Sequence, residues 1–244
     1  MKYFVISDIH AHYDALTSSL KRHGYDSNNC NHHLIVLGDL FDRGKQASKV
    51  LDYLYKLYKD KKTTIILGNH DSFLLDFLNG DSTKVMFNAY YNGFGETLYS
   101  LSRIKLTNNN IDIIREEINK RYPFLLAWLK EFPLFIELDK YIFVHGGIDG
   151  SKNNWRKQLS RDDFIWSQED KMPPVPGKIV VAGHKRIPTI NYKNVDYQKL
   201  FKTNPKAFDI LYLDNKILID RFVEVTNQLN VLILEIDELI EENK

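Results

Sequence analysis

The sequence predicts an α/β protein whose sheet is largely parallel and carries helices on its faces. Five short apolar runs, rich in β-branched residues, each end abruptly in a polar cluster, which is typical of buried strands. Helical patterns lie between these runs, and alternation of strand and helix favours parallel pairing. The runs are residues 3–6, 34–37, 64–67, 141–144 and 179–182.

The spacing of apolar side chains predicts the helices. Residues 46–59 show the clearest pattern, because their apolar side chains fall on one helical stripe and four charged side chains fall off it. Residues 14–23 and 124–130 show similar patterns. Residues 80–135 lack a strand followed by a polar cluster, and we expect them to form a helical insertion beside the active site.

The C-terminal third predicts further strands. Residues 210–213 and 216–219 are separated by Asp214-Asn215, which indicates a hairpin. Residues 231–236 form another strand candidate, and these late runs suggest a second sheet. We expect the whole chain, residues 1–244, to form a single domain.

Composition excludes several classes of protein. The chain has 244 residues and a formal net charge of +1, which argues against a nucleic-acid coat or a polybasic membrane anchor. Its hydrophobic content of 43% is ordinary for a globular protein. Cys30 is the single cysteine, and no apolar run approaches the ~18 residues of a membrane span. We therefore expect a cytoplasmic protein without nucleic-acid or membrane partners, and its oligomeric state stays open.

Polar side chains follow each of the five runs, where functional groups gather in α/β sheets. Carboxylates, an amide and imidazoles form a mixed set that suits Mn²⁺, Fe or Zn²⁺, and not a structural cage of thiolates. Six such groups are too many for one ion with an open position, and they suit two ions that share a carboxylate. The candidate ligands are Asp8, His10, Asp39, Asn69, His145 and His184.

Each candidate by itself has a simpler interpretation as a helix cap, a turn residue or a loop residue. Such coincidences at five successive strand ends are improbable, so the joint pattern favours a metal site. The remaining histidines lack this context, and we expect them at the surface or in loops. They are His12, His23, His32 and His33.

Five sequence blocks resemble the signature of the calcineurin-like metallophosphoesterases. The block Gly-Asp-x-x-Asp-Arg-Gly at residues 38–44 is similar to the phosphoprotein phosphatase branch, which includes bacterial and phage-type Ser/Thr protein phosphatases and the symmetrical diadenosine tetraphosphatases. The resemblance covers residues 3–236 in order. The other blocks are Asp8-x-His10, Gly68-Asn69-His70-Asp71, His145-Gly146-Gly147 and Gly183-His184.

The resemblance implies a central β-sandwich flanked by helices in four layers, with a site for two divalent metal ions. Mn²⁺ is the first expectation for both ions, with Fe or Zn²⁺ as alternatives. Two such ions lower the pKa of a shared water, so that hydroxide attacks phosphorus in line. Carried over by motif, the first metal is bound by Asp8, His10 and Asp39, and the second by Asp39, Asn69, His145 and His184.

The resemblance also implies roles for residues around the metals. We expect His70 to be the general acid that protonates the leaving oxygen, with Asp42 orienting it. Arg43 and Asn69 are expected to contact phosphoryl oxygens, because a guanidinium fork matches phosphate geometry. The alternatives are a structural salt bridge for Arg43 and a plain Asp42–Arg43 ion pair.

One departure from the family pattern affects the substrate side. The family often has an arginine two residues after a tryptophan, and this sequence has Gln168 there. Arg161, Arg186 or Arg221 could supply the missing charge, and we assign Arg186 to the substrate-binding set. Two further departures are present: the usual Gly-His-Thr-Pro block reads Gly183-His184-Lys185-Arg186 here, and a terminal Asp-x-Gly block reads Asp220-Arg221-Phe222. The candidate metal ligands themselves are all present.

These features predict a metal-dependent phosphoesterase, with a Ser/Thr or dual protein phosphatase as the first hypothesis. Its substrate would be a phosphorylated protein or a small phosphoester. The alternative is a symmetrical dinucleoside tetraphosphate hydrolase, in which Tyr90, Tyr91 or Phe94 could stack on adenine, although packing is their more ordinary role. A degenerate, non-catalytic scaffold is a third hypothesis, disfavoured because the motif residues are all present.

Overall fold

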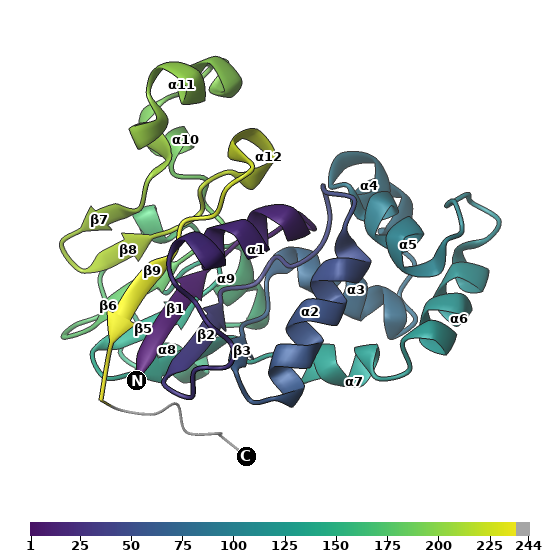
Figure 1. The fold of residues 1–244 in the computed structure, drawn as a ribbon, viewed down its shortest axis with the longest axis horizontal. Helices are drawn as coiled ribbons and strands as arrows, with labels where there is room; N and C mark the ends of the chain where they lie inside the picture. The colour runs from purple at the N-terminus through teal and green to yellow at the C-terminus, as the bar shows by residue number, and fades with distance from the viewer. Residues whose placement is uncertain (238–244) are drawn as a thin grey trace.

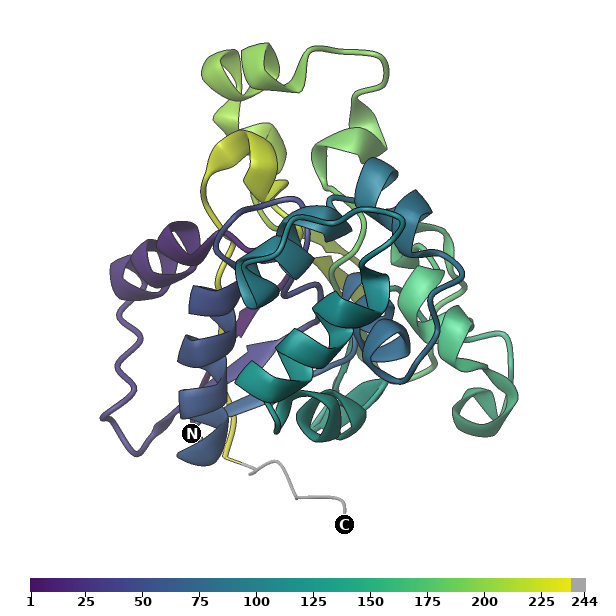
Figure 2. The ribbon, with the colours of Figure 1, turned by 90° about the vertical axis from the view of Figure 1, so that its right-hand side faces the viewer.

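A computed structural model describes residues 1–237, so residues 238–244 of the predicted domain lie outside the described part. Two β-sheets form the centre, and most helices between residues 47 and 130 gather on one side of them (Figure 1). The segment with α10 (Pro188–Asn191) and α11 (Tyr197–Thr203) rises from the top of the molecule in both views (Figure 2). Within the described residues, no helix combines the length and apolar character needed to cross a bilayer.

The first sheet has the strand order β3-β2-β1-β9. β1 (Lys2–Ile6), β2 (His32–Val36) and β3 (Thr63–Ile65) run parallel, which confirms the expected pairing of the first three apolar runs. β9 (Leu232–Glu235) pairs antiparallel with β1. The carboxyl ends of the three parallel strands therefore meet at one edge.

The second sheet has the order β4-β5-β6-β8-β7. β5 (Tyr141–Val144), β6 (Ile179–Ala182) and β8 (Lys216–Leu218) are parallel, and both edge strands are antiparallel. β7 (Leu211–Leu213) and β8 form the predicted hairpin. The edge strand β4 (Phe135–Leu138) was not predicted from the sequence. The five runs are divided between two mixed sheets, which confirms the β-sandwich that the resemblance implied. The alternation of strands and helices by itself indicated only a largely parallel sheet and did not predict this division.

The two sheets pack face to face, and their alternating side chains explain the continuous apolar runs. Tyr3 and Val5 of β1 lie in one apolar cluster with Phe143 of β5 and Val181 of β6. The intervening residues of β1, including Phe4, point to the opposite face and pack against helices. Side chains alternate along a strand and both faces of β1 are covered, so residues 3–6 are all buried and apolar.

Helices cover the outer face of each sheet and complete the four layers that the resemblance implied. The amphipathic helix predicted over residues 46–59 is present, with its apolar stripe buried and its lysines exposed. The first layer contains α1 (Tyr13–Arg22), α2 (Ala47–Lys59), α3 (Asn69–Leu78), α4 (Val85–Tyr91), α5 (Phe94–Ser102), α6 (Ile111–Arg121) and α7 (Leu125–Lys130). The second sheet is covered by α8 (Trp155–Gln158) and α9 (Arg161–Trp166), and α12 (Val223–Thr226) follows β8.

Two histidines expected at the surface or in loops lie in a strand instead. His32 and His33 are the first residues of β2, and both are half-buried. Burial, with a smaller contribution from Lys62, lowers the pKa of His33 to about 4. Two adjacent polar residues before an apolar run did not indicate that they belong to the strand or are partly buried.

A buried carboxyl group in the short 3-10 helix Glu169–Lys171, beside the second sheet, predicts a pH-dependent stability. The side chain of Glu169 is fully buried, and its Oε2 accepts a hydrogen bond from the Ile148 N–H at 2.8 Å. Burial raises the pKa of this carboxyl from 4.5 to about 7. Between these values the unfolded chain has lost the proton that the folded protein keeps. Glu169 therefore lowers the free energy of unfolding as the pH rises from 4.5 to 7.

We expect Glu169→Gln to become more stable relative to the unmodified protein as the pH rises from 5 to 8, by on the order of 3 kcal/mol. The amide keeps an acceptor for Ile148, and Lys216 Nζ still has the Glu169 carbonyl oxygen, at 2.8 Å in the unmodified protein. Thermal unfolding of both proteins across this range measures the difference. A difference in Tm that stays constant with pH would contradict the prediction.

Candidate metal centre

The loops after five strands bring all six predicted ligands to one place. Asp8 and His10 follow β1, and the other four each follow a different strand. Five of the six residues are at most 2% exposed, and His184 is half-buried. The carboxyl ends of the parallel strands in both sheets therefore supply a single site. Its residues are Asp8, His10, Asp39, Asn69, His145 and His184.

Asp39 lies between two groups of ligand atoms. Its Oδ2 is 3.6 Å from His10 Nε2, while its Oδ1 is 3.4 Å from His145 Nε2. Asp8 Oδ1 is 3.8 Å from His10 Nε2 and so belongs to the first group. The two oxygens of one carboxylate thus face separate sets of ligands, which is the arrangement that a bridging ligand requires.

Asn69 completes the second group. Its Oδ1 is 2.9 Å from His145 Nε2 and 3.0 Å from His184 Nδ1. The ligand atoms of Asp39, His145 and His184 all lie within 4.8 Å of one another, which is close enough for one ion to contact all three. One amide oxygen, two imidazole nitrogens and a carboxylate oxygen form a donor set that suits a divalent transition metal.

Backbone carbonyls orient two of the imidazoles. His10 Nδ1 lies 3.0 Å from the Phe41 carbonyl oxygen, and His145 Nδ1 lies 2.6 Å from that of Leu37. A carbonyl can only accept, so each Nδ1 carries the proton and each Nε2 presents its lone pair to the site. This is the arrangement in which histidine binds a metal ion.

The charges of the two aspartates also suit cations. Burial, together with the charges of Asp220 and Asp39, raises the pKa of Asp8 well above its usual value. Burial also opposes ionisation of Asp39, but the surrounding histidines outweigh it and hold the pKa of Asp39 well below its usual range. Two buried carboxylates that repel each other are stabilised by a cation between them. The residues present therefore fit a pair of divalent metal ions.

The backbone at the site is strained, which the sequence does not reveal. Six functional candidates that are not glycine have positive φ angles, between 44° and 70°. Such conformations persist only where the surrounding structure holds them, and they concentrate at functional sites. The six residues are Asp8, His10, Asp39, Asp42, Arg43 and His184.

Glycines allow the loops to approach one another. A Cβ at Gly68 would collide with the Asp39 backbone nitrogen and side chain, and a Cβ at Gly183 would collide with Ser7 and Asp8. The Gly–ligand pairs noted in the sequence thus have a steric cause, because each glycine lets its neighbour lie against the next loop.

Asp71 is a structural centre of the site that the sequence analysis did not single out. Its carboxylate accepts hydrogen bonds from the backbone N–H groups of Asp39 at 2.8 Å, Leu40 at 2.8 Å and Gly68 at 3.0 Å. These bonds join the loop after β2 to the start of α3. Its place in the Gly68–Asp71 block was the only signal in the sequence.

His70 is held at the edge of the ligand cluster by a buried carboxylate. Its Nδ1 is 2.7 Å from Asp42 Oδ2, and Asp42 Oδ1 accepts a hydrogen bond from Thr97 Oγ1 at 2.7 Å. Burial disfavours the imidazolium, but Asp39 and Asp42 outweigh it and raise the pKa of His70 above its usual value. A ring nitrogen of His70 also lies within 4.8 Å of ligand atoms of His10 and Asp39, so metal ligation is geometrically open to His70 as well.

Arg43 and Arg186 lie beside the cluster and meet on a third residue. Arg43 Nη1 contacts His10 Nε2 at 2.6 Å, and Nη2 contacts His70 Nε2 at 3.0 Å. Arg43 Nη1 and Arg186 Nη2 both donate to Glu224 Oε1. The salt bridge considered for Arg43 is therefore made with Glu224, and Asp42 instead faces His70. No sequence motif includes Glu224. It lies 181 residues from Arg43 in the chain, and only the fold brings the two together.

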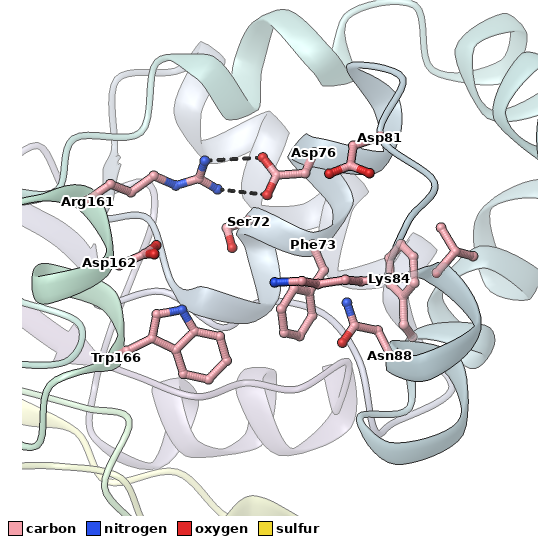
Figure 3. Close-up of a pocket in the computed structure, with 11 residues that line it drawn as sticks. Ser72, Phe73, Asp76, Asp81, Lys84, Asn88, Arg161, Asp162 and Trp166 are labelled. Carbon is pink, nitrogen blue, oxygen red and sulfur yellow. Dashed lines mark hydrogen bonds and ion pairs between the residues drawn. The ribbon is translucent and has the colours of Figure 1, made fainter.

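A cavity of about 200 Å³ adjoins the cluster. Figure 3 shows Arg161 of α9 pairing with Asp76 of α3 along one wall, with Trp166 and Phe73 facing the same space. The Phe73 ring lies 5.2 Å from that of His70, and the Trp166 ring lies 6.0 Å from that of His184. These two aromatic side chains connect the cavity to the candidate metal centre.

The other aromatic candidates lie on α4 and α5. Phe94 is buried and packs edge to face against Phe77. Tyr90 and Tyr91 are 82% and 68% exposed, so packing does not account for them.

Comparison with known proteins gives a consistent family. Residues 1–219 match the model of the calcineurin-like phosphoesterase family. Over 182 residues the chain is 33% identical to an asymmetrical bis(5′-nucleosyl)-tetraphosphatase of Oceanobacillus iheyensis, covering 66% of this chain and 71% of that protein. A Bacillus velezensis protein of the same name is 33% identical over 92 residues. That match covers 35% of this chain, and the aligned part spans only 37% of the relative's length.

More distant similarities lie in other branches. Serine/threonine-protein phosphatase 2 of Salmonella typhimurium is 24% identical over 181 residues, covering 72% of each chain. The crystal structure of a cold-active protein-tyrosine phosphatase from a Shewanella species superposes with a TM-score of 0.56 at 19% identity. The superposition covers 96% of this chain and 75% of the Shewanella chain. At 19% identity it supports the fold alone.

Proposed function

The chain belongs to the calcineurin-like phosphoesterase family, and from that premise we propose that it is a metal-dependent hydrolase of phosphoesters. The observation that carries the proposal is Asp39, whose two carboxylate oxygens face two separate groups of ligand atoms. A shared carboxylate between two nitrogen-and-oxygen donor sets is suited to a pair of metal ions.

Two divalent ions would be held by the six converging residues. When bound, they supply Lewis-acid polarisation of the phosphoryl group and a water that is nucleophilic near neutral pH. We propose Mn²⁺ first, because the donors mix oxygen with imidazole nitrogen and include no thiolate. Asp8, His10 and Asp39 would hold the first ion, and Asp39, Asn69, His145 and His184 would hold the second.

Three side chains would bind the phosphoryl oxygens. Arg43 and Arg186 bring two guanidinium groups to the edge of the cluster, and each retains N–H donors beyond the one given to Glu224. Asn69 would offer its amide nitrogen, beside the ligating amide oxygen, as a neutral donor. These groups orient the phosphoryl group and balance its charge.

His70 would protonate the leaving oxygen. Its Nδ1 is bonded to Asp42, so its Nε2 would carry the proton toward the substrate once Arg43 Nη2, which lies 3.0 Å from Nε2 and can only donate, has moved onto the phosphoryl group. Asp42 in turn is fixed by Thr97. The carboxylate favours the charged imidazole, which is the form that a general acid needs.

For the substrate, we propose a dinucleoside tetraphosphate ahead of a phosphoprotein. The names of the relatives at 33% identity support this order, as does a cavity whose aromatic walls adjoin the metal centre and could contact a nucleobase. The Salmonella relative supports the protein phosphatase that the sequence analysis placed first. We further propose a cytoplasmic location and one domain in which residues 80–135 form the insertion beside the site.

The test compares both substrates with one preparation of the protein. With Mn²⁺ present, we expect p-nitrophenyl phosphate and diadenosine tetraphosphate to be hydrolysed, with a higher kcat/KM for the dinucleotide than for a phosphoserine peptide. A chelator should abolish all three activities, and restored metal should recover them. Chromatography of the nucleotide products distinguishes symmetrical cleavage to two ADP from asymmetrical cleavage to ATP and AMP.

A preference for the phosphopeptide would overturn the proposed substrate while leaving the reaction class intact. If none of the three compounds is turned over with Mn²⁺, Fe²⁺ or Zn²⁺, the reaction class itself fails and the scaffold hypothesis gains support.

A further inference from the structure

Glu224, on the short helix α12, bonds two arginines beside the site, and the mechanism above assigns it no role. We propose that Glu224 is a positioning residue that holds Arg43 and Arg186 together as a paired binding site for one phosphoryl group. This inference rests on the proposed phosphoester hydrolysis and adds a determinant of phosphate affinity to it.

One oxygen of Glu224 joins both arginines. Glu224 Oε1 accepts from Arg43 Nη1 at 3.0 Å and from Arg186 Nη2 at 2.6 Å. The two arginines come from different loops, after β2 and β6, and their like charges repel at this separation. An ionised acceptor between them removes that repulsion and fixes both guanidinium groups. The Glu224 side chain is 21% exposed, so solvent screens the interaction only in part.

A strained turn holds Arg186 from its other side. The Arg186 guanidinium carbon lies 4.1 Å from the centroid of the Phe222 ring, which is a cation–π contact. Phe222 has a φ of 62°, in the left-handed region that bulky residues rarely adopt. Its N–H donates to Asp220 Oδ1 at 2.8 Å, which holds the turn. The turn thus places a ring against Arg186 and, two residues later, a carboxylate beside it.

The same contacts distinguish among the three arginines that could replace the one absent at Gln168. Arg161 pairs with Asp76 at 3.1 Å, and Arg221 pairs with Asp209 at 2.6 Å. In the described part of the chain, Arg186 is the one of these three arginines that shares a salt-bridge partner, Glu224, with Arg43. Glu224 is therefore the residue through which the second arginine is joined to the first.

Two substitutions distinguish the effect of the length of the Glu224 side chain from the effect of its charge. Glu224→Asp keeps the charge but is one methylene shorter and loses the contact with both arginines. Glu224→Gln keeps the length and an acceptor oxygen but loses the charge. We expect Glu224→Asp to raise KM and the inhibition constant of inorganic phosphate on the order of tenfold. kcat should change less, and Glu224→Gln should recover part of the affinity.

Phosphate binding is also measured without turnover, as the rise in Tm that inorganic phosphate causes in the Mn²⁺-loaded protein. Glu137→Asp is the matched control. Glu137 also bonds two cations, Arg156 at 2.5 Å and Lys178 at 3.5 Å, but it lies on β4 outside the site. The control should leave both KM and the phosphate-induced shift unchanged.

The Arg186→Ala background tests whether Glu224 acts through the arginines. There, Glu224→Asp should cost less than in the unmodified protein, because one of the two groups it positions is gone. Unchanged phosphate affinity in Glu224→Asp would overturn the proposal. Tighter phosphate binding would overturn it too, because the carboxylate would then be a competitor of the anion. The thermal shift gives this answer even if no phosphoester is hydrolysed.

Discussion

Replacing Asp39 by Asn or Ala is expected to weaken the binding of both metal ions at once and to lower kcat on the order of 10³-fold or more. Each Asp39 oxygen faces its own group of ligands, with His10 at 3.6 Å and His145 at 3.4 Å. Asp39→Ala therefore removes a ligand from each group, and Asp39→Asn leaves only one neutral oxygen where two charged ones faced the two groups. Metal content after dialysis, measured by atomic emission together with calorimetric titration, checks the result.

Asp8→Asn is the matched comparison, because Asp8 Oδ1 faces the group that contains His10, at 3.8 Å, while its Oδ2 accepts the backbone N–H of His184, at 2.9 Å. We expect it to weaken one metal site and leave the other near its original affinity. Asp39 Oδ1 also accepts the backbone N–H of His70 at 2.9 Å. Asp39→Asn keeps the shape of the side chain and an oxygen for this bond, so we expect it to fold even if Asp39→Ala does not. A folded Asp39→Asn protein that binds two ions with unchanged affinity would show that Asp39 does not bridge.

Replacing His70 by Asn is expected to lower kcat roughly 10²–10⁴-fold while the protein keeps both metal ions. The loss should be smaller for p-nitrophenyl phosphate than for an alkyl phosphate, because nitrophenolate leaves without a proton. Asp42→Asn should cause a smaller loss, since Asp42 acts only by bonding His70 Nδ1 at 2.7 Å. Steady-state kinetics with both leaving groups, combined with metal analysis, measures these effects.

His23→Asn is the control for His70→Asn, because His23 is an exposed residue at the end of α1. The cluster geometry also provides an alternative outcome, since His70 lies within ligand distance of His10 and Asp39. If His70→Asn loses metal, and if its kcat falls equally for both leaving groups, His70 is a ligand and the general acid must be sought elsewhere.

The candidate ligands could be predicted from the sequence because their position is a local property. A buried strand needs an apolar run, and the polar residues directly after it mark the strand end, as Ser7 and Asp8 follow Ile6 and His145 follows Val144. Helix α2 was predicted for a similar reason, since its apolar stripe repeats at helical spacing. In each case the signal extends over a few consecutive residues.

Other elements left no such signal. β4 is four residues long and alternates apolar and polar character only once, at Glu137. α3 begins at Asn69, directly after the third apolar run, so its first turn was interpreted only as a strand end. The strand runs did not indicate which sheet each would join, because a strand buried on both faces is apolar in either sheet.

Local sequence pattern was thus sufficient to predict the α/β class, the strand ends and the residues proposed as metal ligands, since each depends on residues that are neighbours in the chain. Only the folded structure decides that Asp39 lies between two groups and that Glu224 joins Arg43 to Arg186. These relations depend on loops separated by more than 100 residues and on positive φ angles that neighbouring loops hold in place. No pattern within one segment records contacts made between segments.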